Sequence, residues 1–176
     1  MTPAARNRQY MQLCWVVPDL ETAIARWVEQ AGAGPFFLFE DVHFDDGVYR
    51  GTPADVAPHR AAIGQHGDMQ IELIQPLGDD PGIWRDVVPF GGFGLHHTGL
   101  YCEDYEAEKQ ALLASGASLA FEGRMMGAPT CYLDTVSTLG FMTELITANP
   151  VAERVFAMFR DAALGWDGSD PIRRLG

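Results

Sequence analysis

The sequence has few cysteines, no long apolar run and few positive charges. Its three cysteines, Cys14, Cys102 and Cys131, are far apart and form no C-x-x-C pair, which excludes a structural zinc knuckle and suits reduced thiols. No stretch approaches the roughly eighteen apolar residues of a membrane-spanning helix. Arg6 and Arg8 are not followed by the apolar run of a secretory signal. We therefore expect a cytoplasmic protein.

The shortage of positive charge excludes two classes of partner. Lys and Arg total 12 against 24 Asp and Glu, which gives a formal net charge of −12. Such a chain repels the phosphates of nucleic acid and the surface of an anionic membrane. We expect neither partner, and a small molecule instead.

What the sequence does have is an internal repeat. Residues 16–21 lead into a helical stretch that ends at Gly32, and residues 100–106 lead into another that ends at Gly116. Asp19 and Asp104 are 85 positions apart, and so are Gln12 and His97. An offset shared by a helix cap and a strand residue indicates one supersecondary unit used twice.

Hydrophobic periodicity and turn residues predict the elements of each half. We expect each half to have the order β-α-β-β-β. Residues 51–67 are predicted to be a long loop or a poorly defined helix, and residues 76–94 an irregular linker. The predicted strands are 9–17, 36–39, 43–50 and 68–75 in the first half and about 95–102, 119–122, 130–133 and 141–147 in the second, with helices at 19–32 and 104–115.

The predicted fold is therefore α+β. We expect one domain over residues 1–176, with modules at about 9–76 and 95–149 that pair into a cupped mixed β-sheet. Residues 150–176 would form an extra amphipathic helix, over 151–164, and a loose tail. This helix has three possible places: over the cup, in a dimer interface or packed in the core.

Four polar residues occupy equivalent points of four predicted strands. Gln12 and His97 lie in the first strand of each half, and Glu72 and Glu144 in the last. Alternate side chains of a strand share a face, so a common cleft would bring one amide, one imidazole and two carboxylates together. Each residue alone has a plain structural interpretation, a solvent-facing Glu or a buried core His. Their joint placement favours a site, since burying two carboxylates without a partner is costly.

This mixture of oxygen and nitrogen donors suits one divalent ion such as Zn²⁺, Ni²⁺, Co²⁺, Mn²⁺ or Mg²⁺. An ion with open positions binds a carbonyl oxygen and stabilises the enolate formed by proton loss at the adjacent carbon. A carboxylate at or beside the ion, Glu144 or Glu72, would act as the base. We expect His43, His59 and His66 to lie on the surface, with His43 the one able to reach the cleft. Cys14 is expected to be a small buried side chain that faces the site or the core.

In order and spacing, the segments QLCWVVPDLETA, MQIELIQPLGDD, GLHHTGLYCEDYEAEKQALLASGA and FMTELI resemble the vicinal oxygen chelate superfamily. That group includes glyoxalases, methylmalonyl-CoA epimerases, extradiol dioxygenases and bleomycin-resistance proteins. The resemblance covers residues 9–149 and is strongest to the epimerase branch. It implies metal ligands at Gln12, Glu72, His97 and Glu144.

The sequence departs from the epimerase pattern at two positions. Epimerases carry His at the position of Gln12 and a second catalytic Glu near Val48, where this chain has no equivalent Glu. The Gln/Glu/His/Glu set resembles that of some glyoxalases, although their glutathione-binding Arg is not recognisable here. Gln12 disfavours the dioxygenase and fosfomycin-modifying branches.

The sequence thus predicts a metal-dependent lyase or isomerase, epimerase-like or glyoxalase-like, that acts on a carbonyl compound through an enolate. Glu144 would be ligand and general base, Glu72 a ligand and catalytic carboxylate, His97 a ligand and Gln12 a weak neutral ligand. We expect a homodimer. The alternative is a protein of the same fold that binds and sequesters a small molecule without catalysis. Convergence of Gln12, Glu72, His97 and Glu144 would favour the enzyme, and an empty apolar cleft the binding protein.

Overall fold

The computed structural model describes residues 8–174. The stretch considered above for a secretory signal, through residue 7, and the last two residues of the tail lie outside the described residues. The helices are α1 Leu20–Arg26, continued by the π-helical turn η1 Trp27–Ala31, α2 Ile83–Val87, α3 Tyr105–Ala114, α4 Val136–Leu139 and α5 Pro150–Ala163. The strands are β1 Tyr10–Val16, β2 Phe36–Phe39, β3 Asp45–Tyr49, β4 Thr52–Pro53, β5 His59–His66, β6 Met69–Pro76, β7 Gly94–Cys102, β8 Ser118–Met125, β9 Ala128–Asp134, β10 Met142–Thr147 and β11 Ile172–Arg174.

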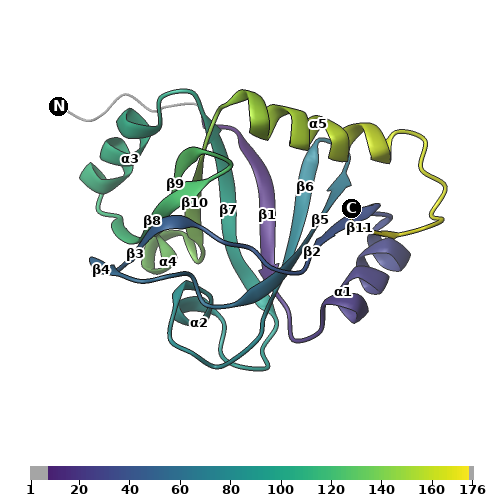
Figure 1. The fold of residues 1–176 in the computed structure, drawn as a ribbon, viewed down its shortest axis with the longest axis horizontal. Coiled ribbons are helices and arrows are strands. Elements are labelled where there is room, and N and C mark those ends of the chain that lie inside the picture. Colours follow the sequence, from purple (N-terminus) through teal and green to yellow (C-terminus); the bar gives the residue numbers. More distant parts are fainter. Residues whose placement is uncertain (1–7, 175–176) are drawn as a thin grey trace.

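Within residues 8–174, eleven strands form one mixed sheet in the order β11-β2-β5-β6-β1-β7-β10-β9-β8-β3-β4. The first half of the chain supplies β2, β5, β6 and β1, and the second half supplies β7, β10, β9 and β8. The halves meet where β1 pairs antiparallel with β7. Figure 1 shows these two strands at the middle of the molecule, with α1 on one side and α3 on the other. The predicted α+β class is confirmed, and the elements that each half supplies to the central part of the sheet follow the order β-α-β-β-β, as β1-α1-β2-β5-β6 and β7-α3-β8-β9-β10.

The repeat is also confirmed in the helix caps. The Asp19 carboxylate accepts a hydrogen bond from the Thr22 N–H at 2.8 Å, and Asp104 accepts one from the Ala107 N–H at 3.0 Å. Each bond satisfies one of the four amides that a helix start leaves without an internal partner. The same type of cap therefore begins the helix that follows the first strand in both halves.

The prediction for residues 51–67 was wrong, because they contain β5, a full strand of the sheet. Its small residues suggested a loop, yet they are small for a packing reason. A Cβ added at Gly64 would lie 2.9 Å from the Phe36 ring on β2. Ala61 and Ala62 are likewise buried. The large side chains of β2 thus occupy the space that β5 leaves free, which a strand-propensity pattern cannot reveal.

The strand predicted at 43–50 exists as β3 but is not part of the first module's sheet. It pairs antiparallel with β8, at the far edge of the second half. Figure 1 shows the chain from β2 to β3 crossing in front of the central strands. Arg50, just after β3, contacts Asp86 at 2.7 Å and Asp134 at 3.0 Å and so ties the crossing segment to α2 and the end of β9.

Two segments predicted to be irregular are ordered elements. The linker over 76–94 contains α2, whose Trp84 is 1% exposed and fills one end of the cup. The tail contains β11, which pairs in parallel with β2. Trp166 anchors that tail: a Cβ at Gly34 would lie 2.7 Å from its ring.

Helix α5 covers one end of the cup. Asn149 caps it by accepting from the Val151 and Ala152 amides at 2.9 and 3.0 Å, and Pro150 opens its first turn. Its buried face, Ala152, Phe156 and Phe159, packs against Phe37, Ile63 and Ile146 of the sheet. In the described part of the chain, no helix is long and apolar enough to cross a membrane.

Candidate metal centre

Adjacent strands place the candidate residues in one row. On β1, Cys14 is the Cα partner of Glu72 on β6 and of His97 on β7. His97 in turn pairs with Met142 on β10, two residues before Glu144. Because alternate residues share a face, Glu72, Cys14, His97 and Glu144 all project into the cup.

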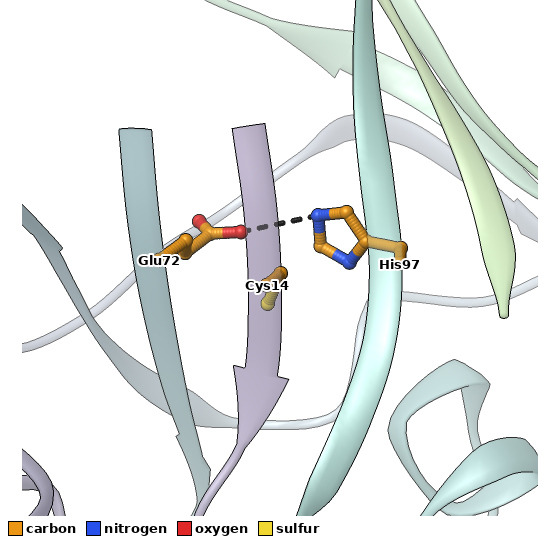
Figure 2. A group of neighbouring side chains, drawn as sticks. All are labelled: Cys14, Glu72 and His97. Atoms are coloured by element: carbon orange, nitrogen blue, oxygen red, sulfur yellow. Dashed lines mark ion pairs between the residues drawn. The ribbon is translucent and has the colours of Figure 1, made fainter. Parts of the chain in front are cut away.

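Two carboxylates meet one imidazole nitrogen there. His97 Nε2 lies 3.1 Å from Glu72 Oε2 and 3.3 Å from Glu144 Oε2. The side chains of His97, Glu72 and Glu144 are 0%, 13% and 5% exposed. Figure 2 shows Glu72 and His97 facing each other across β1, with Cys14 between them. None of the residues lining the adjacent cavity is Lys or Arg, so His97 is the one cationic partner of the two carboxylates among the residues of the cluster and the cavity wall.

The spacing of these atoms fits a divalent ion. Neighbouring ligands about 2.1 Å from a metal lie roughly 3.0–3.4 Å from one another, which matches the two His97 distances of 3.1 and 3.3 Å. Glu72 Oε2, His97 Nε2 and Gln12 Oε1 are buried and make no well-aligned hydrogen bond. Buried polar atoms without partners are costly, and a cation would satisfy all three.

Gln12 lies in the next row of the same face. It is 3% exposed and lines the same cavity as Glu72 and Glu144. Its Nε2 donates to Gln70 Oε1 at 3.3 Å, which leaves its own oxygen free. Gly99 makes room for it, because a Cβ there would lie 3.0 Å from Gln12 Oε1. The amide oxygen is thus available as a neutral donor.

His96, the first of the two histidines, orients the second. His96 Nε2 lies 2.8 Å from the Ile83 carbonyl, to which it can only donate, so the neutral ring has its Nδ1 free to accept. That Nδ1 lies 2.9 Å from His97 Nδ1, which must therefore donate. The chain of two bonds fixes the His97 ring and directs Nε2 at the carboxylates, an arrangement typical of the residue behind a metal-binding His.

A β-bulge allows both histidines to point inward. The β1–β7 register shifts between the pairs Cys14–His97 and Trp15–Leu95, so His96 is the extra residue. A bulge re-aims a side chain that regular alternation would send to the other face. Both rings are completely buried. Neither histidine of the pair is therefore a surface residue.

Burial and charge together shift the pKa values of the cluster. Burial alone would lower the pKa of His97, but the hydrogen bonds and charges of Glu144 and Glu72 outweigh it and raise that pKa to about 9. For Glu72, burial is outweighed by His97, and the carboxyl pKa falls. Burial and the charge of His97 lower the pKa of His96 to about 3. Without a bound ion, the cluster therefore holds an imidazolium between two carboxylates.

A small cavity of about 50 Å³ adjoins the cluster. Its polar wall includes Gln12, Glu72, Glu144 and Thr130, and its apolar wall comes from the β8–β9 turn and α5. Phe156 is its one aromatic residue. Other large aromatic side chains do not line it: Trp84 and Phe36 are core residues, and Phe90 and Phe93 are 64% and 59% exposed.

The structure thus brings Glu72, His97 and Glu144 together and places Gln12 at the same cavity. Of the other histidines, His43 is exposed beside Asp41 and His66 is exposed, as expected. His59 is 2% exposed and packs on Trp84, so its expected surface position was wrong. Cys14 faces the cluster rather than the core alone. Its sulfur, a Glu72 oxygen and a His97 nitrogen lie within 4.8 Å of one another.

Comparison with known structures shows the same fold in several proteins. Methylmalonyl-CoA epimerase from Mycobacterium tuberculosis is 18% identical, with a TM-score of 0.56 over 86% of this chain and 97% of that one. The Streptomyces coelicolor enzyme in complex with 2-nitronate-propionyl-CoA is 20% identical, with a TM-score of 0.54 over 80% and 97%. A hypothetical protein from Bacillus halodurans is 17% identical, with a TM-score of 0.57 over 82% and 96%.

The sequence comparisons are narrower. No curated protein sequence matches this chain significantly. Residues 11–133, which include β1, the crossing segment and most of the second half, match the model of one family. The chain therefore belongs to the Glyoxalase/Bleomycin resistance protein/Dioxygenase superfamily.

Proposed function

We propose that this protein is a metal-dependent lyase or isomerase that removes a proton from the carbon next to a carbonyl. The observation that carries the proposal is the meeting of Glu72 and Glu144 at one imidazole nitrogen, at 3.1 and 3.3 Å, in a buried cluster. Two buried carboxylates are stable only with positive charge nearby. A divalent ion would supply that charge, and with it Lewis-acid stabilisation of a substrate oxyanion.

The chain's own residues have distinct roles in this proposal. Glu72 and His97 would hold the ion, and Gln12 would add a neutral oxygen. Glu144 is the general base, because its carboxylate borders both His97 and the cavity where a substrate carbon would lie. The Thr130 hydroxyl, which donates to the Leu145 carbonyl at 2.8 Å, stays 3.5 Å from Glu144 Oε1 and limits its movement.

A single shuttling carboxylate supports an isomerisation or elimination better than a two-base epimerisation. The segment that would carry a second Glu is β3, Asp45–Tyr49, on the sheet edge beside β8. None of its residues lines the cavity, whose two acids are Glu72 and Glu144. The known structures of this fold include epimerases of a thioester, so a thioester is one substrate class to test. The small, partly polar cavity gives little support to the alternative of a protein that only sequesters a ligand.

Elemental analysis of the purified protein beside Glu144→Gln tests the metal. Near one divalent ion per chain in both proteins is the expected result, because Glu144 acts as the base while Glu72 and His97 hold the ion. The loaded protein is then incubated in deuterium oxide with methylmalonyl-CoA or with the hemithioacetal of methylglyoxal and glutathione. Exchange should fall by about 10²-fold or more in Glu144→Gln, the usual size of a general-base effect. A wild-type chain that takes up no metal even on reconstitution would refute the proposal.

A further inference from the structure

The thiol of Cys14 occupies a position that the four predicted ligands do not explain. Cys14 is the Cα partner of both Glu72 and His97 and is fully buried between them. Its sulfur is within 4.8 Å of the donor atoms of both. Figure 2 shows the side chain projecting from β1 on the same face as the Glu72–His97 ion pair.

A second, independent observation indicates that a ligand belongs at this point. His97 is 0% exposed, and its Nε2 makes no well-aligned hydrogen bond although it faces Glu72 and Glu144. Gln12 is 3% exposed and also has an unpartnered oxygen. Cys14 therefore adjoins a group of buried polar atoms that make no well-aligned hydrogen bond and that a cation would bind.

We propose that Cys14 is a further ligand of the divalent ion and that its sulfur, with Glu72 and His97, forms the core of the metal centre. This inference rests on the metal of the proposed function. The sulfur lies within 4.8 Å of the Glu72 oxygen and the His97 nitrogen, so a small rotation of the Cys14 side chain would bring Sγ to bonding distance from an ion held by these two residues. A bound thiol is a thiolate: one metal–sulfur bond forms, and the thiol proton is released to solvent.

The thiolate changes the charge balance of the centre. Cys14 and Glu72 together neutralise a dication, so the carboxylate of Glu144 is not needed for charge and is left to act as the base. A sulfur donor also favours Zn²⁺ and Co²⁺ over Mg²⁺ and Mn²⁺, which prefer oxygen ligands. The proposal thus narrows the metals that the sequence left open.

Cobalt substitution tests this assignment without any substrate. The metal-free protein is titrated with Co²⁺, and the visible d–d bands and the near-ultraviolet sulfur-to-cobalt charge-transfer band are recorded. The wild type should show both. Cys14→Ser should lose the charge-transfer band and keep d–d bands, and its thermal unfolding should confirm that it folds. Cys102→Ser is the matched control, because Cys102 is also a buried free thiol but lies at the C-terminal end of β7, five residues after His97. This variant should keep both bands.

The outcomes separate the two proposals. Visible d–d bands without a charge-transfer band in the wild type would overturn the role of Cys14 and leave the proposed function standing. The absence of d–d bands in the wild type would overturn both the proposed metal-dependent function and the role of Cys14. A charge-transfer band that survives in Cys14→Ser would assign the sulfur to another cysteine and overturn the inference. Should Cys14→Ser fail to fold, Cys14→Ala is measured in its place, with the same expected loss.

Discussion

His96 and His97, neighbours in sequence, are hydrogen-bonded through their Nδ1 atoms at 2.9 Å. The bulge at His96 makes this contact possible, and the Ile83 carbonyl on α2 determines its direction. Helix α2 therefore fixes the orientation of the His97 ring through the Ile83 carbonyl and the His96 ring.

Replacing His96 should weaken the metal centre without removing any ligand. We expect His96→Ala to lower metal affinity by about 10- to 100-fold, the usual effect of losing the group behind a metal-binding His. His96→Asn should retain much of the affinity, because its amide oxygen can accept from His97 Nδ1. Competition against a chelator measures both. Equal losses in the two variants would show that the ring acts through packing on Trp84 instead.

The metal-free protein should lose stability as the pH rises. The pKa of His97 is raised from 6.5 to about 9, so its contribution is fully present below about pH 6.5 and is lost as the pH passes through 9. The linkage gives a decrease of at most about 3 kcal/mol in the free energy of unfolding. Urea unfolding between pH 6 and pH 10 measures it. His97→Asn, the control, should lack this slope; an equal slope in both proteins would contradict the assignment.

Gly99→Ala should disturb Gln12 specifically. The new methyl group would lie 3.0 Å from both Cβ and Oε1 of Gln12 and 3.2 Å from Ile146. Overpacking of a buried site costs about 1–3 kcal/mol, and the displaced amide should bind metal less well. Denaturant unfolding and a metal titration report the two effects. Gly116→Ala, at a helix end with open space around it, is a control for stability alone, since its φ of 104° makes it strained. Unchanged metal affinity in Gly99→Ala would exclude Gln12 from the ligand set.

Phe156→Ala should widen the cavity beneath α5. Phe156 lines the cavity and packs on the Tyr101 ring at 5.7 Å. Its truncation should cost about 3–5 kcal/mol and admit larger carbonyl compounds. Phe159→Ala, on the same buried face but not in the cavity wall, should lose comparable stability without that change in selectivity. A panel of substrates of increasing size compares the variants, and identical selectivity would show that α5 does not limit the site.

Local sequence patterns predicted most of the fold, because repeated caps and strand alternation are short-range signals. Asp19 and Asp104 located both helices, and alternation placed Glu72 and Glu144 on the inner face. Local patterns could not locate β5, because its Gly64 is small for a reason that lies on another strand, the Phe36 ring packed against it. Complementary packing between distant strands leaves no periodic signal.

The candidate site shows the same division. Gln12, Glu72, His97 and Glu144 were predicted from their equivalent places in the repeat, and the metal they would bind remains a prediction. The neighbouring residue His96 was not assigned a role, since a bulge changes the face to which a side chain points without changing the sequence pattern. For Cys14 the sequence left two orientations open, toward the site or toward the core, and only the pairing of β1 with its neighbours shows that the thiol faces Glu72 and His97.

The crossing of β3 onto β8 has a consequence for the chain as a unit. A half expressed alone would leave either β3 paired with the two-residue β4 alone or the outer edge of β8 bare. Bare strand edges template association with other chains. By covering the edge of β8, strand β3 therefore protects the molecule against aggregation. This protection requires that the two halves stay in one polypeptide or associate after separation.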